Sequence, residues 1–192
     1  VDVAVYEDTS HQRHDARVED FQNLRHPGLC NLLDDGLVGV RPYLVFERPT
    51  GRPLRQCLGH RRLSVDELAP SFTQLLLAVS HIHAAGLVHR ELTTDTVFVA
   101  GEIGRTTTVK IGGTHGCRRA GELAEVGTIS SHDTLAIRVS ELSPARVEAC
   151  DDVFSLGILF KECLDLDAAE TKESYAALRK IDTLIRACLS PV

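Results

Sequence analysis

The segment VHRELTTDTVFV, residues 88–99, places a histidine and an arginine directly before the carboxylate of Glu91, and three threonines and Asp95 follow Leu92. The carboxylate, Glu91, is a group that can accept a proton during catalysis. Thr96, further along the segment, is a poorer magnesium ligand than an amide oxygen. The glycine-rich segment KIGGTHG that follows, residues 110–116, supplies no carboxylate either. Glu91 is thus a candidate proton acceptor, whereas Thr96 and Gly113 offer no carboxylate to a metal ion.

Cysteine and histidine are plentiful in this chain but poorly spaced for binding a metal ion. The sequence has six cysteines and nine histidines, and the cysteines form no C-x-x-C pair. His81 and His83 are two residues apart near the end of an expected helix, so they point to different sides. We expect free, mostly buried thiols, a reducing cytoplasmic location, and no metal or other cofactor.

Composition narrows the class of protein. The 192 residues are 43% hydrophobic and 25% charged, which is enough for one domain with a substantial core. A net charge of -6 argues against a general nucleic-acid binder, which usually carries a basic surplus. No apolar run reaches the roughly 18–20 residues that span a bilayer, so we expect no membrane segment. The sequence begins at Val1 and contains no methionine, so we expect it to be part of a longer protein.

The elements that must position these residues follow from the periodicity of the apolar side chains. A capping box of Ser64 and Glu67 predicts the start of a long helix, and Gly86 predicts its end. Strands are predicted over Val1–Glu7, Arg41–Glu47, Val97–Val99 and Val109–Ile111, and further helices over 15–26, 151–164 and 174–189. Because short strands come first and helices follow, the sequence predicts an α+β domain with a small strand-rich end and a larger helical end.

The order of the motifs resembles the protein kinase superfamily over nearly the whole chain. VAVY at residues 3–6 is similar to the strand V-A-I-K, VHREL at 88–92 to V-H-R-D-L, and VKIGG at 109–113 to V-K-I-x-D. The resemblance implies a partial N-lobe over 1–48 and a C-lobe over 49–192 that is truncated after helix H. Short segments are also similar to with-no-lysine kinases and to nuclear receptor-binding-protein pseudokinases.

The resemblance implies that the machinery of phosphoryl transfer is degenerate in this chain. Tyr6 stands where a lysine holds the phosphates, and Arg17 stands where helix C supplies its acidic partner. A register slip from Arg17 to Glu19 would still leave no lysine to pair with it. Glu91 is one methylene longer than the aspartate base, and a misplacement of about an ångström can cost on the order of a hundredfold in rate. The degenerate positions are Tyr6, Arg17, Glu91, Thr93, Thr96, Gly113 and Ala145.

Residues with scaffold roles persist beside these losses. The resemblance makes His89, Arg90 and Asp152 anchors of the fold, because the helix F aspartate holds the backbone of the His-Arg turn. We therefore expect a pseudokinase that does not bind ATP and that acts as a protein-interaction scaffold. Two alternatives stay open: a divergent serine/threonine protein kinase with residual ATP binding or activity, and a purely structural subunit of a large assembly.

The expected partners are other protein chains, and neither nucleic acid nor a membrane. The strand over Val1–Glu7 lacks the two strands that precede it in a kinase, so its edge and part of an apolar face are expected to be exposed. Bare strand edges are usually covered, charged or shortened in native proteins. The sequence therefore predicts that another chain, or upstream residues outside this sequence, covers this strand.

Overall fold

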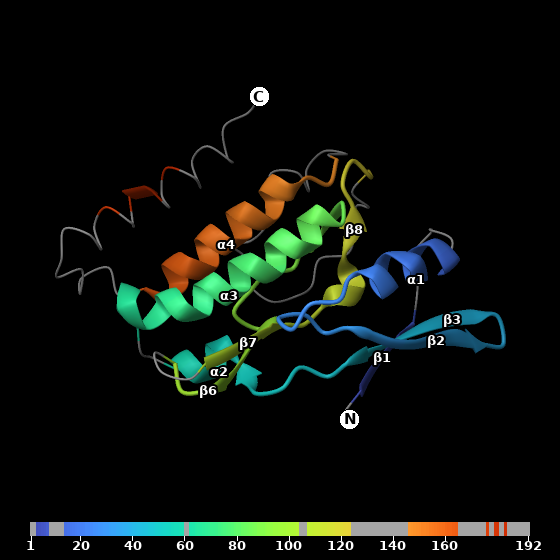
Figure 1. Ribbon diagram of the computed structural model, residues 1–192, viewed down its shortest axis with the longest axis horizontal. Coiled ribbons are helices and arrows are strands. Elements are labelled where there is room, and N and C mark those ends of the chain that lie inside the picture. The colour runs from blue at the N-terminus through green and yellow to red at the C-terminus, as the bar shows by residue number, and fades with distance from the viewer. Residues whose placement is uncertain are drawn as a thin grey trace.

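The computed structural model describes residues 3–7, 14–59, 62–103, 107–123, 146–164, 176, 179–180 and 183. Within these residues it is an α+β fold, in which a small sheet and one helix sit at one end of a larger body containing two long helices (Figure 1). In chain order the elements are β1 (Val3–Glu7), α1 (His14–Asn23), β2 (Leu32–Val38), β3 (Arg41–Glu47), β4 (Arg52–Pro53), α2 (Leu54–Leu58), α3 (Val65–Ala84), β5 (Leu87–Val88), β6 (Val97–Gly101), β7 (Thr107–Ile111), a 3-10 turn (Thr114–Gly116), β8 (Arg118–Arg119) and α4 (Ala149–Cys163).

The first sheet is antiparallel, with strand order β1-β3-β2. Its central strand β3 has the predicted bounds, and the alternation of its side chains buries Leu44 and Phe46 on one face. Strand β2 was not predicted, because Asp34 and Asp35 interrupt the apolar alternation of this segment. The pairing of β2 with β3 also shifts register between Leu32 and Asp34. The sheet thus contains two strands that the sequence predicts, β1 and β3, and one that it does not.

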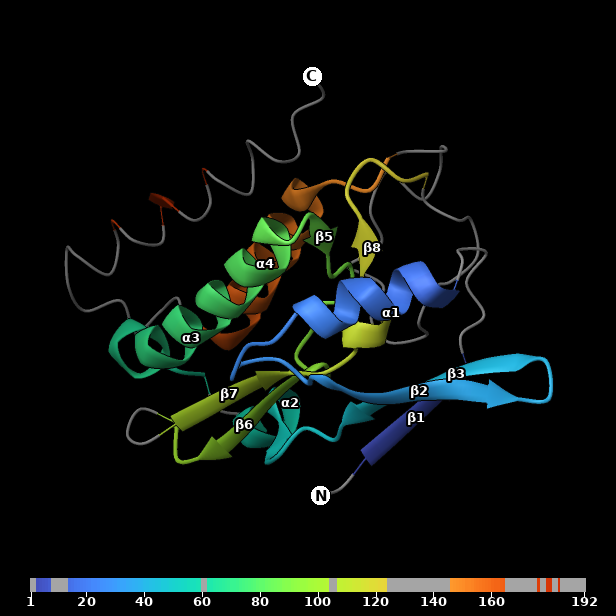
Figure 2. The same cartoon turned by 45° about the vertical axis from the view of Figure 1, so that its right-hand side comes forward.

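Helix α1 covers one face of this sheet (Figures 1 and 2). It is the amphipathic helix that the sequence predicts, and it ends before Pro27 as expected. Val18, Phe21 and Leu24 are 9%, 2% and 1% exposed. The ring of Phe21 meets that of Phe46 edge to face, with 5.3 Å between centroids. Apolar packing therefore fixes the position of α1 on the sheet.

Helix α3 begins at the predicted capping box. The Ser64 hydroxyl accepts from the Glu67 amide at 3.3 Å, and the Glu67 carboxylate accepts from the Ser64 amide at 3.0 Å. The helix ends just before Gly86, whose φ of 74° favours glycine. Pro70 is the sixth residue of α3 rather than part of its first turn, so the carbonyl of Asp66 lacks a helical N–H donor. α4 runs alongside α3 in both ribbon views.

The predicted hairpin is present and extends further than its apolar positions indicate, as β6 and β7. The segment between α1 and β2 connects the hairpin to the first sheet by two backbone hydrogen bonds. The amide of Cys30 donates to the carbonyl of Ile111 at 3.1 Å, and the amide of Ile111 donates to the carbonyl of Gly28 at 2.8 Å. One buried apolar cluster runs through both parts. This junction brings the strand-rich end next to the VHREL segment.

The stretch after residue 113 contains two short elements that the sequence does not predict. It forms a 3-10 turn, and β8 pairs with β5. Elements of two or three residues are too short to leave a periodicity in the sequence. Ala145 and most of the helix predicted over 174–189 lie outside the described residues.

The five described cysteines are free thiols, and Cys30, Cys117 and Cys163 are buried, as the sequence predicts. Cys188 lies outside the described residues. Among the helices of the described ranges, none has the length and apolarity needed to cross a bilayer.

Candidate functional site

A cleft of about 590 Å³ lies between the β1–β3 sheet and the β6–β7 hairpin. Four of the predicted degenerate positions line it, namely Tyr6, Glu91, Thr96 and Gly113. Arg17 and Thr93 lie behind its walls and contact lining residues. The degenerate positions within the described residues therefore all lie at or next to one cleft. The predicted fold anchors lie beneath it.

The floor of the cleft is held by Asp152 in the first turn of α4. Its side chain is fully buried and accepts from the backbone amides of His89 at 2.8 Å and Arg90 at 2.7 Å. These bonds hold Arg90 at a φ of 73°, a left-handed conformation that is unfavourable for a residue other than glycine. The His89 ring is also fully buried and its Nε2 lies 2.9 Å from the Gly112 carbonyl. Together these contacts fix the turn that presents Glu91.

His83 is a third partner of Asp152, which the sequence analysis did not identify. Its Nε2 lies 2.8 Å from the Asp152 carboxylate. Burial raises the pKa of Asp152, but the bonds from His83 and from the His89 and Arg90 amides, with the charge of His89, outweigh it, so the net pKa is lowered. His81, two residues earlier, faces the His26 ring instead, with 5.2 Å between centroids. This agrees with the prediction, from their spacing, that His81 and His83 point to different sides of the helix.

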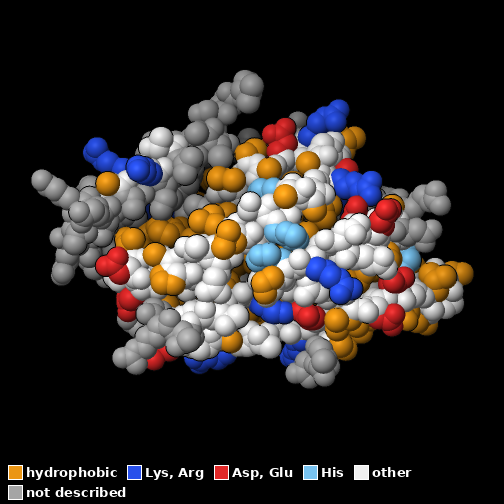
Figure 3. All heavy atoms as spheres, in the orientation of Figure 1, with side chains coloured by type: hydrophobic (Ala, Val, Ile, Leu, Met, Phe, Trp, Pro, Cys, Tyr) orange, Lys and Arg blue, Asp and Glu red, His pale blue; other side chains and the backbone are white. Residues whose placement is uncertain are grey.

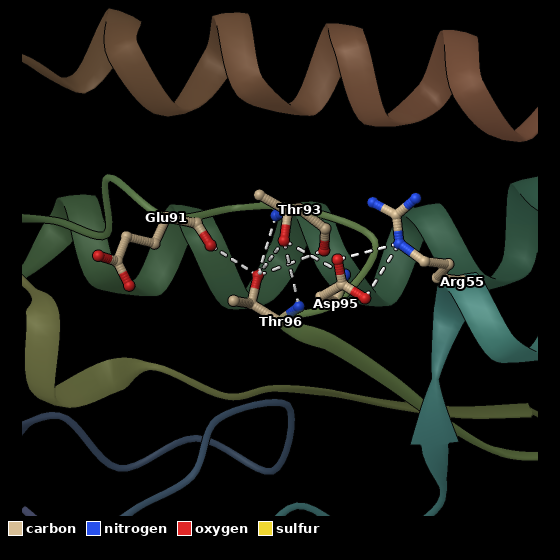
Figure 4. A network of polar contacts seen from close by, with 5 residues as sticks. All are labelled: Arg55, Glu91, Thr93, Asp95 and Thr96. Carbon is tan, nitrogen blue, oxygen red and sulfur yellow. Dashed lines mark hydrogen bonds and ion pairs between the residues drawn. The ribbon is translucent and has the colours of Figure 1, made fainter. Parts of the chain in front are cut away.

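Thr93 and Thr96, which follow VHREL, form hydrogen bonds within their own loop (Figure 4). The Thr96 hydroxyl donates to the Glu91 carbonyl at 2.6 Å and accepts from the Thr93 amide at 2.9 Å. The Thr93 hydroxyl accepts from the amides of Asp95 at 3.2 Å and Thr96 at 3.3 Å. Asp95 pairs with Arg55, with 3.0 Å from Nε to each carboxylate oxygen. These oxygens thus organise the loop and are not gathered around a metal position.

The carboxylate of Glu91 is turned away from that network and toward the 3-10 turn (Figure 4). Its Oε2 would lie 3.7 Å from a Cβ atom at Gly116 and 3.9 Å from one at Gly113. No hydrogen bond or ion pair to this carboxylate is found within the described residues. Glu91 is therefore an uncompensated negative charge on the wall of the cleft.

Next to Glu91, two stacked aromatic rings form part of the cleft wall. One of them is Tyr6, which stands where the kinase resemblance places a phosphate-binding lysine. The rings of Tyr6 and His115 are stacked, with 3.6 Å between centroids and 14° between planes. Arg17 is 4% exposed, donates to the His115 carbonyl, and lies 5.1 Å from the centre of the Phe21 ring. Burial raises the pKa of Tyr6. Burial, together with the nearby Arg17 charge, lowers the pKa of His115 to about 4, so both rings are neutral at pH 7.

Two ion pairs connect the strand-rich end of the fold with the larger part. Lys110 of β7 bonds to Glu47 at the end of β3, and this bond lowers the pKa of Glu47 although burial alone would raise it. Arg119 of β8 holds Asp20 of α1 by two bonds of 2.8 Å each. Both contacts join residues far apart in the sequence, so no local sequence pattern predicts them. Within the described residues, no group of three His, Cys, Asp or Glu side chains could hold a metal ion.

Comparison with known sequences identifies the family. A sequence model of the protein tyrosine and serine/threonine kinase family matches residues 3–186. The chain belongs to the protein kinase family. The predicted superfamily is thus confirmed, and so is the predicted kinase-like α+β fold with a small strand-rich part and a larger helical part.

Three relatives show how this kinase-family chain compares with named proteins. It is 34% identical over 92 residues to hormonally up-regulated neu tumor-associated kinase homolog B of Xenopus laevis, covering 47% of the chain and 14% of that protein. It is 36% identical over 88 residues to sperm motility kinase 1 of Mus musculus, covering 45% and 18%. It is 26% identical over 176 residues to serine/threonine-protein kinase nekl-2 of Caenorhabditis elegans, covering 82% and 46%. The chain therefore spans less than half the length of each of these relatives.

Proposed function

We propose that this kinase-family domain is catalytically inactive and acts by binding other protein chains. The observation that carries the proposal is the Tyr6–His115 stack with Arg17 behind it. Phosphoryl transfer needs a cation on the phosphates and carboxylates on magnesium. Here the two cleft-wall residues are neutral rings in contact with each other, and the Arg17 cation beside them donates to a backbone carbonyl. The groups at these positions stabilise one another in place of a nucleotide.

The charge of the cleft supports the same conclusion. Glu91 faces it with an unpaired carboxylate, and Gly113 supplies no magnesium ligand. A triphosphate at this wall would meet a negative charge with neither lysine nor metal to offset it. Like charges separated by about 4 Å repel by about 4 kcal/mol at the effective dielectric of a protein surface. The proposal therefore includes the absence of productive ATP binding.

A divergent kinase remains the second candidate, because Glu91 lies in the cleft and the named relatives are kinases. Converting Glu91 to aspartate tests it. We expect neither the natural chain nor Glu91→Asp to transfer thiophosphate from ATP-γ-S to itself or to a general protein substrate, because catalytic groups act as a unit and a single repair is not additive. Thiophosphorylation by Glu91→Asp would favour the divergent kinase. This conclusion holds whether or not the double variant Tyr6→Phe, Glu91→Asp is also active.

The partner surface that we propose is the outer edge of β1. This strand is at the edge of its sheet in the described structure, and its outward side chains Val3 and Val5 are 48% and 64% exposed. Leu37, Val38 and Val40, at the β2–β3 hairpin, are 64%, 71% and 93% exposed. Figure 3 shows hydrophobic side chains gathered at this end of the molecule. An exposed strand edge beside apolar side chains is a common site of strand addition by another polypeptide.

Hydrogen exchange of the Val3–Tyr6 amides tests this surface. We expect the β1 amides that point away from β3 to be protected in the native assembly and to exchange fast once the assembly is dissociated. The β3 amides serve as the control, because β3 is paired on both sides and should stay protected in both states. Fast exchange of β1 in both states would contradict a partner at this edge.

A further inference from the structure

The turn between α1 and β2, residues 26–31, joins the two parts of the fold and passes between α3 and β7 (Figure 2). The carbonyl of Gly28 accepts from the Ile111 amide at 2.8 Å, and the amide of Cys30 donates to the Ile111 carbonyl at 3.1 Å. A Cβ atom at Gly28 would come within 3.0 Å of the Ala78 Cβ atom in α3, so the turn lies directly against that helix. The turn is therefore held in place by close contacts with both elements.

The same turn is bonded to the first sheet. The amide of His26 donates to the side-chain oxygen of Asn31 at 3.2 Å, which closes the turn on itself. The Asn31 carbonyl accepts at 2.9 Å from the amide of Glu47, at the end of β3. A change at His26 can therefore reach β3 through Asn31, as well as α3 and β7 through Gly28.

Two histidine rings meet where the turn lies on α3. The rings of His26 and His81 are 5.2 Å apart between centroids, and both residues are partly buried. The Nδ1 atom of His26 accepts from the Gly28 amide at 3.0 Å. The Nε2 atom of His81 is buried and has no hydrogen-bond partner among the residues that the structure describes. One ring nitrogen of the pair thus accepts a bond, and another has no partner.

The charged groups of the neighbouring elements provide no counter-charge for this pair. Lys110 of β7 bonds to Glu47 of β3, and His83 of α3 bonds to the Asp152 carboxylate of α4. Arg25 is exposed and has the same sign of charge as a protonated ring. Within the described ranges, no carboxylate pairs with either ring. A proton bound here would therefore have no ionic partner.

Protonation is incompatible with the hydrogen bonding of both rings. Because its Nδ1 accepts a bond, the neutral His26 ring carries its proton on Nε2. A second proton would place an N–H at Nδ1 against the Gly28 N–H, and that hydrogen bond would be lost. A charged His81 ring would carry an N–H at the buried Nε2, which has no acceptor in the described structure. Burial and the neighbouring His81 lower the pKa of His26, in agreement with this geometry.

We propose that the His26–His81 pair is a proton-sensitive joint, whose protonation in mildly acidic solution separates the turn from α3 and β7. The joint is closed while His26 is neutral. Because the pKa of His26 in the closed turn lies below its ordinary value of 6.5, the opened turn binds the proton more tightly. Opening therefore becomes more favourable as the pH falls below about 6.5, by at most about tenfold for each pH unit. The joint acts in this way whether or not the cleft binds ATP.

Hydrogen exchange of the Gly28 and Ile111 amides in the full 192-residue chain tests the joint. We expect their protection, corrected for intrinsic exchange rates, to fall about tenfold more between pH 7 and pH 5 in the natural chain than in His26→Asn. Asparagine can still accept a bond from the amide two residues on, but it does not titrate. Both chains retain His115, so its contribution to the pH dependence cancels. An equal loss of protection in the two chains would overturn the proposal.

His14→Asn is the matched control for His26→Asn. His14 is also a partly buried histidine, but it lies at the start of α1 beside Asp35. Between pH 7 and pH 5 this variant should lose as much protection at Gly28 as the natural chain does. A His14→Asn chain that instead behaves like His26→Asn would show that the effect does not arise at the His26–His81 pair.

An NMR titration of the natural chain tests the joint even if His26→Asn does not fold. The His26 ring should titrate with a midpoint below pH 6.5, and the Gly28 amide resonance should change with the same midpoint. His81→Gln should raise the His26 midpoint, because the neighbouring charge that opposes protonation is removed. A His26 midpoint at or above 6.5, or a Gly28 amide that does not follow it, would refute the joint.

Discussion

Replacing Asp152 with alanine is expected to lower the free energy of unfolding by about 3–5 kcal/mol, the range for removing one partner of a buried charged network. The carboxylate is fully buried and has three partners: His83 and the amides of His89 and Arg90. Without it, the buried His89 amide and the partly buried Arg90 amide lose their acceptor, and the left-handed backbone of Arg90 loses its support. At about 2–4 °C per kcal/mol for a chain of this size, the melting temperature should fall by roughly 10 °C.

Asp151 provides the matched control for Asp152. It is the preceding residue in the same helical turn, and its carboxylate accepts from the exposed Glu148 amide at 3.1 Å. Asp151→Ala should cost about 1 kcal/mol, as the loss of a helix cap does. Equal and small effects of the two substitutions, measured by denaturant titration, would contradict the role of Asp152 as the anchor of the His-Arg turn.

Acid should destabilise the domain through His115 as the pH falls from about 6.5 to about 4. The pKa of this histidine is lowered from 6.5 to about 4 by burial and by the charges of Arg17, His89 and Arg118. Between these two values the unfolded chain binds a proton that the native state does not, so stability falls as the pH falls through this window. Each pH unit contributes at most about 1.4 kcal/mol, and we expect a loss of about 2–3 kcal/mol between pH 7 and pH 4 from this group.

The His115→Phe variant isolates this contribution, because phenylalanine keeps a ring against Tyr6 without a titrating nitrogen. Its stability should fall by about 2–3 kcal/mol less than that of the natural chain over the same pH range. Tyr6→Phe alters the other ring of the stack and should retain the full pH dependence. Parallel pH profiles of the natural chain and His115→Phe would show that His115 titrates normally in the native state.

Local sequence patterns were sufficient to predict the elements that rest on local interactions. The alternation in Arg41–Glu47 predicts β3 with its observed bounds, and the Ser64–Glu67 capping box predicts the start of α3. Both signals arise from side chains a few residues apart. Strand β2 was missed because its adjacent aspartates disturb the alternation, and a register shift in its pairing accommodates them.

The candidate site depends on contacts between distant residues, which no local pattern encodes. His83 and Asp152 are 69 residues apart in the sequence, and Arg17 and His115 are 98 apart. The resemblance to kinases identified which positions had changed. It did not indicate that Tyr6 would stack on His115 or that the Glu91 carboxylate would be left unpaired in the cleft. Those features follow from which side chains the fold brings together.

Calorimetric titration of the natural chain with magnesium-ATP tests the central claim most directly. Tyr6 stacks on His115, Arg17 donates to a backbone carbonyl, and Gly113 has no carboxylate, and we propose that these changes prevent the cleft from holding the phosphates and the metal. We predict no magnesium-dependent heat of binding with ATP in the micromolar range. Saturable, magnesium-dependent ATP binding in that range would contradict the account and support a divergent kinase.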